Sequence, residues 1–167
     1  MIVGKGNISS MLTDRDDVTF FASGVSDSLC TDEKEFEREI NLLLSMPKEK
    51  HIVYFSSLGI FRWDSRYMKH KKTIEKLIKD TFNSYTIVRV EVISWGKNPN
   101  TIHNYFRRML NEGKAICLQD TIRYVVDSVE FKYWMNYIRV GERDEMNITG
   151  KPHHVCDIYK MVKEGHL

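Results

Sequence analysis

The chain has 167 residues, of which 42% are hydrophobic and 29% are charged, and its formal net charge is +2. This length is enough for one domain with a buried core and is short for two. The nearly balanced charge gives no general electrostatic case for nucleic-acid binding, and no apolar run is long enough to predict a membrane span.

The first part of the chain alternates apolar runs with amphipathic stretches. A short apolar start, Met1–Gly4, leads into a glycine turn and the beginning of a helix over residues 5–12. A second strand is predicted over Asp17–Ser23, because its middle is continuously apolar. A helix is predicted over Asp32–Met46, where apolar residues form one stripe, and Pro47 ends it.

The same alternation continues to the end of the chain. Two further strands and two further helices are predicted from clear patterns, and three shorter elements follow in the last third of the chain. The strong ones are a strand over His51–Phe55, a helix over Tyr67–Phe82, a strand over Tyr85–Ile93 and a helix over Thr101–Leu110. The weaker ones are a helix over Asp127–Tyr137, a strand over Glu145–Thr149 and a helix over Pro152–Lys163. Strands alternating with helices predict one α/β unit with a parallel sheet covered on both faces.

The cysteines and histidines predict neither disulfides nor a metal site. Cys30, Cys117 and Cys156 are odd in number and far apart, which favours a reducing compartment, so we predict a cytoplasmic protein. His153 and His154 lie close to Cys156, but their spacing fits no standard zinc pattern.

The most informative motif is a tyrosine and a lysine four residues apart, Tyr67 and Lys71, after a strand that ends in Ser56 and Ser57. This spacing places the phenol and the ammonium on one face of a helix. A neighbouring positive charge lowers the pKa of a phenol, and a serine hydroxyl can hold a substrate oxygen. The motif therefore predicts proton transfer at a carbinol oxygen while a cofactor takes the hydride.

These segments, in this order, resemble the extended short-chain dehydrogenase/reductase superfamily, in particular the NAD-dependent epimerases and dehydratases that act on nucleotide sugars. The resemblance runs nearly end to end but is strong only in islands. The islands are residues 4–9 (glycine-rich phosphate loop), 20–25, 39–41 (acidic-apolar-Asn step), 53–57 (serine-bearing strand), the Tyr67/Lys71 pair, 88–89, 96, 98–101, 123–127 and 147–150. The run 98–101 resembles a polysaccharide-cluster branch of the group.

The resemblance implies a catalytic set. Tyr67 would be the acid/base, and Lys71 would lower its pKa and touch the nicotinamide ribose. Ser57 rather than Ser56 would hold the reacting oxygen, because Phe61 stands where the family usually has tyrosine. Asn41 would support Lys71 through a water molecule.

The resemblance also implies binding residues, with NAD or NADP as cofactor and a nucleotide sugar or related small molecule as substrate. The cofactor-binding set is Gly4, Gly6, Asn7, Ile8, Ala22, Ser23, Gly24 and Ser56. The substrate-binding set is Arg89, Asn98, Asn100 and Arg123. The choice between NAD and NADP stays open, since the strand that carries the discriminating residue is absent.

The chain departs from the family pattern in two ways. Ser9 stands at the third glycine of the loop. More importantly, the sequence passes from Leu12 through Asp14, Asp16 and Asp17 directly into what would be the fourth strand, so the second and third strands of the Rossmann unit are missing. The fold predicted is thus a truncated Rossmann-like sheet over residues 1–167, in which residues from about 97 onward form a small substrate-side region.

Three functions remain open at this point. The first is a minimal NAD(P)-dependent nucleotide-sugar epimerase, reductase or dehydratase. The second is a non-catalytic nucleotide- or sugar-binding or regulatory module derived from such an enzyme, which the missing segment favours. The third is a structural subunit. The resemblance also implies a homodimer through helices 32–46 and 67–82.

Overall fold

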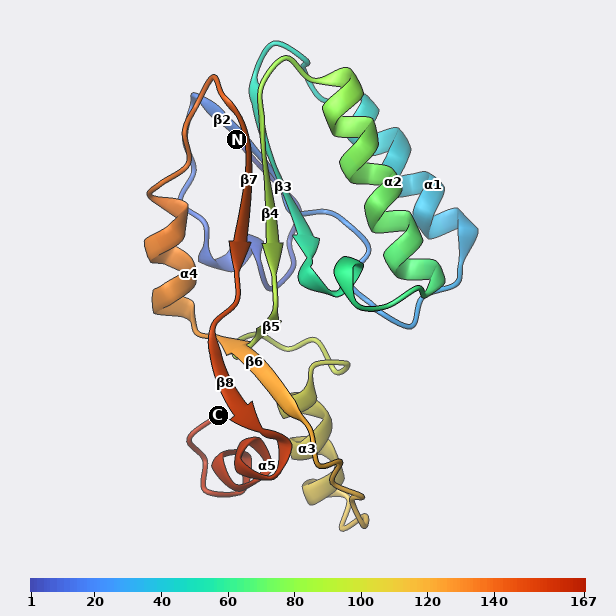
Figure 1. Cartoon of the computed structure of the whole chain (residues 1–167), viewed down its shortest axis with the longest axis vertical. Helices are drawn as coiled ribbons and strands as arrows, with labels where there is room; N and C mark the ends of the chain where they lie inside the picture. The colour runs from blue at the N-terminus through green and yellow to red at the C-terminus, as the bar shows by residue number, and fades with distance from the viewer.

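A computed structural model describes all residues from Met1 to Leu167 (Figure 1). The helices are α1 (Glu33–Leu44), α2 (Arg66–Thr81), α3 (Ile102–Asn111), α4 (Ser128–Met135) and α5 (Val155–Lys163), with 3₁₀ turns η1 (Ser9–Met11) and η2 (Leu58–Phe61). The strands are β1 (Ile2–Val3), β2 (Val18–Phe21), β3 (His51–Ser57), β4 (Tyr85–Val90), β5 (Val92–Ile93), β6 (Ile122–Val126), β7 (Arg143–Ile148) and β8 (Lys151–His154).

The larger sheet has five strands in the order β1-β2-β3-β4-β7, and every pair in it is parallel. Successive side chains of a strand point to opposite faces. In β3, Val53 belongs to the core that contains Phe131 of α4, whereas Ile52 belongs to the core that contains Ile74 of α2. Figure 1 shows α4 on one side of the sheet and α1 with α2 on the other. The predicted Rossmann-like α/β sheet with helices on both faces is therefore confirmed.

The helix expected after the glycine turn is reduced to the single 3₁₀ turn η1. The hydroxyls of Ser9 and Ser10 donate to the carbonyls of Gly6 and Asn7, 2.7 Å away in each case, and Leu12 is already extended at ψ 147°. Side-chain bonds of this kind compete with the helical ladder. The predicted beginning of an α-helix within residues 5–12 is therefore wrong.

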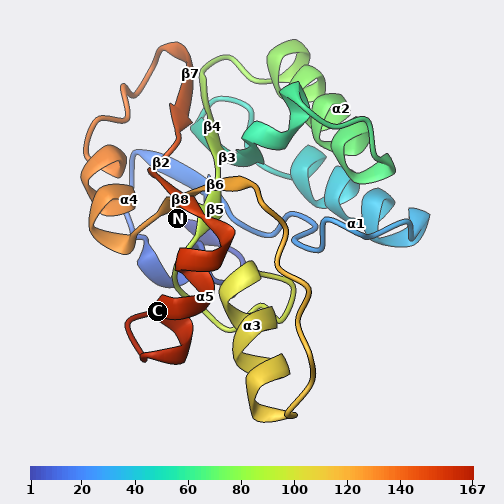
Figure 2. The same ribbon diagram turned by 60° about the horizontal axis from the view of Figure 1, so that its bottom comes forward.

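A smaller sheet of three strands, β5-β6-β8, lies at the end of the molecule that carries α3 and α5 (Figure 2). The strand predicted over Tyr85–Ile93 is interrupted at Glu91. Its first part, β4, belongs to the larger sheet, and its second part, β5, belongs to the smaller one. β6 was not predicted, and the helix expected from Pro152 begins only at Val155, because β8 pairs antiparallel with β6. Phe106, Val125 and Ile158 join α3, β6 and α5 in one core.

The outward faces of α1 and α2 are polar. Leu44 is the one large hydrophobic residue of the two helices that is exposed. The two helices are joined by the ion pair of Glu33 with Arg66 at their N-terminal ends. A homodimer through this surface stays a prediction. No helix of the structure combines the length and the apolar character needed to cross a membrane.

Candidate functional site

The carboxyl ends of the parallel strands carry the loops on which the expected site residues lie. In open α/β sheets, ligands bind in the crevice outside these ends. β1 leads into the loop at Gly4, β2 into Ala22–Gly24, and β3 ends at Ser56 and Ser57. The fold therefore gathers the predicted cofactor-binding residues at one edge of the sheet.

The glycine-rich loop presents unused backbone donors. None of the amides from Lys5 to Ser9 donates to a protein acceptor. Gly4 has a φ of +126°, and a Cβ there would lie 2.3 Å from the carbonyl oxygen of Ala22, so this position requires glycine. Successive free amides in a turn form an anion-binding concavity. The loop can therefore receive phosphate oxygens even without a following helix.

Asn7 ties this loop to the small-sheet region. Its carbonyl accepts from the Trp95 indole N–H at 2.8 Å, and its side-chain Oδ1 accepts from the Lys97 amide at 3.1 Å. Gly96 has a φ of +89° and packs so tightly that a Cβ would lie 2.1 Å from Asn7 Cγ. Ile8, the remaining predicted member of the loop, packs into the core that contains Phe131.

Lys71 lies in a buried network centred on Glu39. The side chains of Lys71 and Glu39 are 3% and 0% exposed, and their Nζ and Oε1 atoms are 3.2 Å apart. Lys71 Nζ also donates to the Tyr54 hydroxyl at 2.9 Å, and that hydroxyl donates to Glu39 Oε1 at 2.8 Å. His70 Nε2 lies 3.0 Å from Glu39 Oε2, which also accepts from the Val25 amide at 2.7 Å.

The loop after β2 covers Lys71 and Glu39. A Cβ on Gly24 would lie 2.8 Å from both Glu39 Oε1 and Lys71 Nζ. Ala22 and Ser23, which precede it, are half-buried, and the Ser23 carbonyl accepts from the Arg38 guanidinium. The ammonium of Lys71 is thus sealed inside the protein.

Asn41 makes no direct contact with Lys71, and its predicted support through a water molecule stays a prediction. Asn41 is exposed and makes no side-chain hydrogen bond, whereas Glu39 contacts Lys71 directly. Glu39 falls on the same helical stripe as the buried Phe36 and Leu43, three positions after the first and four before the second. A charged residue on an apolar stripe was the sequence signal that could have identified it.

Tyr67 is held in a setting that opposes ionisation. Burial raises the pKa of its phenol and outweighs the opposing effect of Lys71, so the pKa is above its ordinary value. The Nζ of Lys71 lies 5.5 Å from the centre of the Tyr67 ring, and the Tyr67 hydroxyl makes no hydrogen bond to another protein group. The expected lowering of the Tyr67 pKa by Lys71 is therefore not the net effect.

Ser56 and Ser57 differ in their hydrogen bonding. Ser57 Oγ accepts from the Gly59 amide at 3.1 Å and starts η2. Ser56 Oγ is buried without any hydrogen-bond partner, which is costly for a hydroxyl. Ser57 is half-buried and its hydroxyl hydrogen stays free to donate, whereas the Ser56 hydroxyl is closed off from solvent.

The substrate-binding set does not come together. Arg89 is 5% exposed and joins α2 to β7, because its guanidinium donates to Glu75 and to Glu145. Asn98 Oδ1 accepts from the Asn100 amide at 3.0 Å and shapes the turn before α3. Arg89 therefore has a structural role here rather than one in ligand contact.

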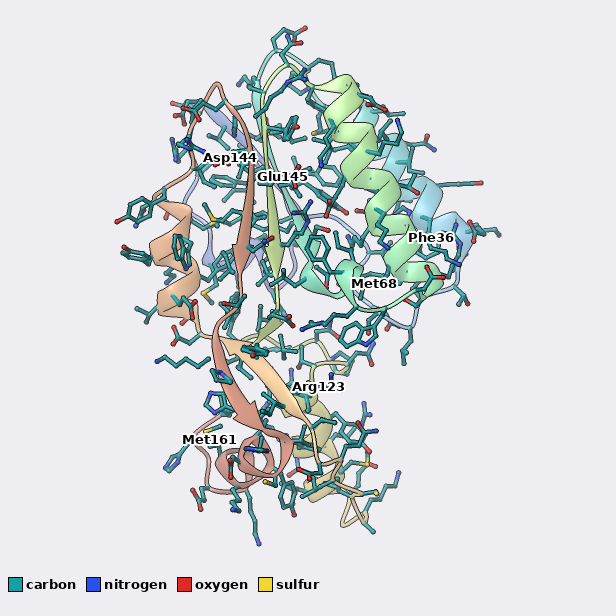
Figure 3. All side chains as sticks on the ribbon, in the orientation of Figure 1. Phe36, Met68, Arg123, Asp144, Glu145 and Met161 are labelled. Atoms are coloured by element: carbon teal, nitrogen blue, oxygen red, sulfur yellow. The ribbon has the colours of Figure 1, made fainter.

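Arg123 is the member that lies near the crevice. Its guanidinium carbon is 5.7 Å from the centre of the Trp63 ring, and Figure 3 shows it below Met68 of α2, toward the small sheet. Tyr124, which follows Arg123 in β6, lines a small cavity of about 180 Å³ together with residues just after β3 and β4. The ion pair of Arg62 with Glu91 lies in its wall. Since pockets for drug-sized ligands measure roughly 300–1,000 Å³, this cavity holds only part of a nucleotide sugar.

The hydrogen-bonded network around Glu39 should make the free energy of unfolding depend on pH in the acid range. Burial alone would raise the pKa of Glu39, but the charge of Lys71 and the hydrogen bonds from His70, Val25 and Tyr54 lower it from 4.5 to about 2. A carboxyl with a lowered folded-state pKa stabilises the fold above its unfolded pKa, and this stabilisation is lost as the pH falls toward about 2. We expect a loss of about 3 kcal/mol over that range.

Urea unfolding followed by circular dichroism at a series of pH values between neutrality and strong acid would measure this loss. The Glu39→Gln variant is the control, since it lacks the titrating group and should show a flatter acid dependence. An equally steep dependence in that variant would assign the acid sensitivity to other carboxyls.

Comparison with known proteins establishes the fold. No protein-family profile and no curated protein sequence matches the chain. Among solved structures, the Bordetella bronchiseptica enzyme WbmG in complex with NAD and UDP matches with a TM-score of 0.69 and 12% identity over 89% of this chain. A dTDP-4-dehydrorhamnose reductase from Bacillus anthracis in complex with NADP matches with a TM-score of 0.65 and 17% identity over 90% of it. A Thermus thermophilus UDP-glucose 4-epimerase in complex with NAD has a TM-score of 0.62 and 10% identity over 89% of it.

The chain is shorter than these proteins, because it spans 56% of WbmG, 62% of the reductase and 61% of the epimerase. The predicted resemblance to nucleotide-sugar short-chain dehydrogenase/reductase enzymes is thus confirmed at the level of the fold, and so is the prediction of a shortened version. β1 is an edge strand, and no strand pairs outside it.

Proposed function

We propose that the chain binds a nucleotide or nucleotide sugar on its Rossmann-like sheet without carrying out hydride transfer on its own. The observation that carries this proposal is the bond of the Lys71 ammonium to Glu39 inside the protein. A lysine in this state cannot touch a nicotinamide ribose, and the pKa of Tyr67 stays above its ordinary value.

The binding half of the proposal rests on the glycine-rich loop. Its free amides lie at the carboxyl end of β1, where the phosphates of a nucleotide would be held. Residues of this loop fit the pyrophosphate of NAD or NADP, but the chain has no strand on the outer side of β1 to receive the adenosine. We therefore expect a ligand to be held by its phosphates, with the Arg123 and Trp63 side of the crevice next to its sugar.

Calorimetric titration with UDP-glucose, NAD⁺, NADH, NADP⁺ and NADPH tests the proposal, with a Tyr67→Phe variant alongside. We expect sub-millimolar binding of UDP-glucose and weaker binding of the dinucleotides. Tyr67→Phe should leave these affinities unchanged. Absence of binding by all five ligands at millimolar concentration would refute the proposed binding function.

The second candidate is an NAD(P)-dependent epimerase or reductase acting on a nucleotide sugar. The specific observation in its favour is the Tyr67 ring beside the Lys71 ammonium, on a fold shared with such enzymes. Here Tyr67 would move the proton, and the nicotinamide would donate the hydride in a reductase or accept and return it in an epimerase. A net change in nicotinamide absorbance with a nucleotide sugar for a reductase, or an epimerised sugar product for an epimerase, lost in Tyr67→Phe, would establish this candidate instead.

A further inference from the structure

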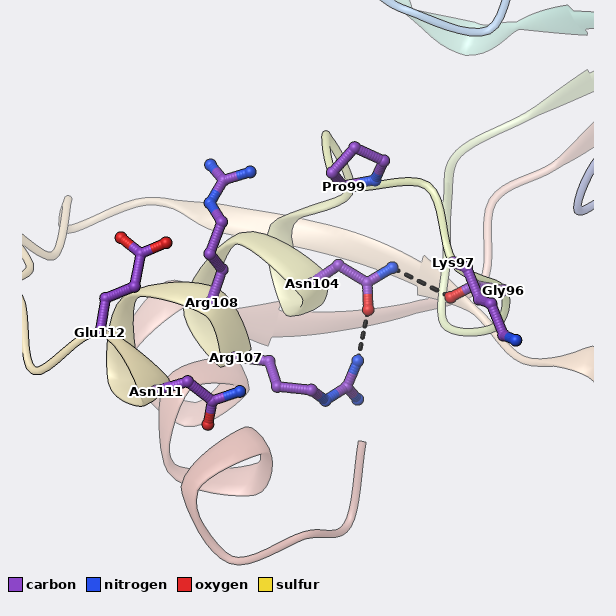
Figure 4. A pocket seen from close by; sticks show the side chains of 8 residues that line it. All are labelled: Gly96, Lys97, Pro99, Asn104, Arg107, Arg108, Asn111 and Glu112. Carbon is purple, nitrogen blue, oxygen red and sulfur yellow. Dashed lines mark hydrogen bonds between the residues drawn. The ribbon is translucent and has the colours of Figure 1, made fainter.

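A polar hollow lies between α3 and the loop that precedes it. It has a volume of about 480 Å³, and no hydrophobic residue lines it. Its wall consists of Gly96, Lys97, Pro99, Asn104, Arg107, Arg108, Asn111 and Glu112 (Figure 4). We call this the α3 pocket.

The α3 pocket has an excess of positive charge. Lys97, Arg107 and Arg108 contribute three cations against the single carboxylate of Glu112. That carboxylate is already paired with Lys114 at 2.6 Å, and the hydrogen bond from Lys114 lowers the pKa of Glu112. The charge that faces the hollow is therefore positive, although the net charge of the whole chain is only +2.

One of these cations is held in place before any ligand arrives. The Asn104 side-chain amide donates to the carbonyls of Gly96 and Asn98, 2.9 Å away in each case. Its oxygen accepts from the Arg107 guanidinium, which also donates to the main-chain oxygen of Leu167 at 2.8 Å. Figure 4 shows Asn104 between the Gly96 carbonyl and Arg107. A guanidinium fixed in this way loses little conformational entropy when it binds an anion.

We infer that the α3 pocket binds a sugar phosphate. Guanidinium groups pair with phosphate oxygens through charge-assisted hydrogen bonds, and the amides of the pocket suit hydroxyl groups. The wall offers no aromatic side chain on which a nucleobase could stack. The volume of about 480 Å³ suits a monosaccharide with its phosphate. The α3 pocket meets the glycine-rich loop where Asn7 contacts Gly96 and Lys97. Its cations lie outside that loop, so the inference does not depend on the function proposed for the loop.

The test is titration of the isotope-labelled protein with glucose 1-phosphate, followed by amide and side-chain amide NMR. We expect shifts centred on the Asn104 and Asn111 side-chain amides and on Gly96, and no shifts with glucose. Inorganic pyrophosphate serves as a second probe, because it separates phosphate recognition from sugar recognition.

An Arg107→Met variant should weaken the binding of glucose 1-phosphate at least tenfold. The matched control is Lys132→Met, which removes an exposed cation from α4 and should leave the affinity unchanged. Shifts confined to Gly4 and Gly6, or equal affinity in Arg107→Met and wild type, would overturn the inference. Neither result would bear on UDP-glucose binding at the loop, so the two proposals fail separately.

Discussion

Glu39→Gln is expected to lower the free energy of unfolding by about 3–5 kcal/mol. Glutamine keeps the shape of the side chain but removes the charge that compensates Lys71, whose ammonium is only 3% exposed. The Tyr54 hydroxyl and the Val25 amide lose a charged acceptor in the same step. A buried ion left without its partner is among the most destabilising changes in a protein.

Urea unfolding at neutral pH would measure the effect, with Glu37→Gln as the matched control. Glu37 is on the same helix but exposed, so its replacement should change the stability by no more than about 0.5 kcal/mol. Adding Lys71→Met to Glu39→Gln should recover part of the loss, since no uncompensated charge then remains buried. Strictly additive losses in the double variant would show that the two residues do not act as a pair.

Gly4→Ala is expected to be the second most damaging change, at about 3 kcal/mol or more. A non-glycine residue at φ +126° carries a strain of about 1–3 kcal/mol, and the new Cβ would lie 2.3 Å from the Ala22 carbonyl oxygen. The carbonyl oxygen is a backbone atom and the Cβ is bonded directly to the backbone, so neither can move without the chain. The clash is therefore relieved only if the loop after β1 moves away from the loop after β2. Binding of UDP-glucose should fall together with stability.

Gly6→Ala provides the control within the same loop. Its φ is not positive, and no atom lies within 4 Å of the added Cβ, so the fold should tolerate the change. Thermal unfolding of the two variants would separate them clearly. If Gly6→Ala destabilised the protein as strongly as Gly4→Ala, the conformation of this loop would differ from that described.

The sequence identified those elements whose pattern is local. The continuous apolar run of β3 and the amphipathic stripe of α1 predict their elements directly, and α2 followed from its own periodicity. β6 and β8 are short, polar in part and stabilised by pairing across a long separation, such as Arg123 with His153. No local signal distinguishes such strands from loops, because their hydrogen bonds exist only in the assembled sheet.

In the candidate site, too, some features have a local sequence signal and others arise only from the packing of the folded chain. The residue types at Tyr67 and Lys71 and their helical spacing were evident, and so was the glycine loop. What the sequence did not reveal is that Lys71 already has a partner. The resemblance pointed to Asn41, yet on a helix of 3.6 residues per turn Glu39 and Asn41 lie on different faces. Only the packing of α1 against α2 decides which of them meets Lys71.

The position of β7 in the larger sheet has a consequence for the order in which the chain can fold. Tyr85 of β4 pairs with Arg143, and the intervening chain forms all of the small sheet except β8 before returning. Until residues 143–148 are available, β4 remains an open edge and Arg89 lacks the Glu145 carboxylate. Parallel pairings over such separations form late, because the entropy of closing a long loop must be overcome first. The nascent protein therefore carries an arginine paired only with Glu75 at a sheet edge until residues 143–148 have been synthesised.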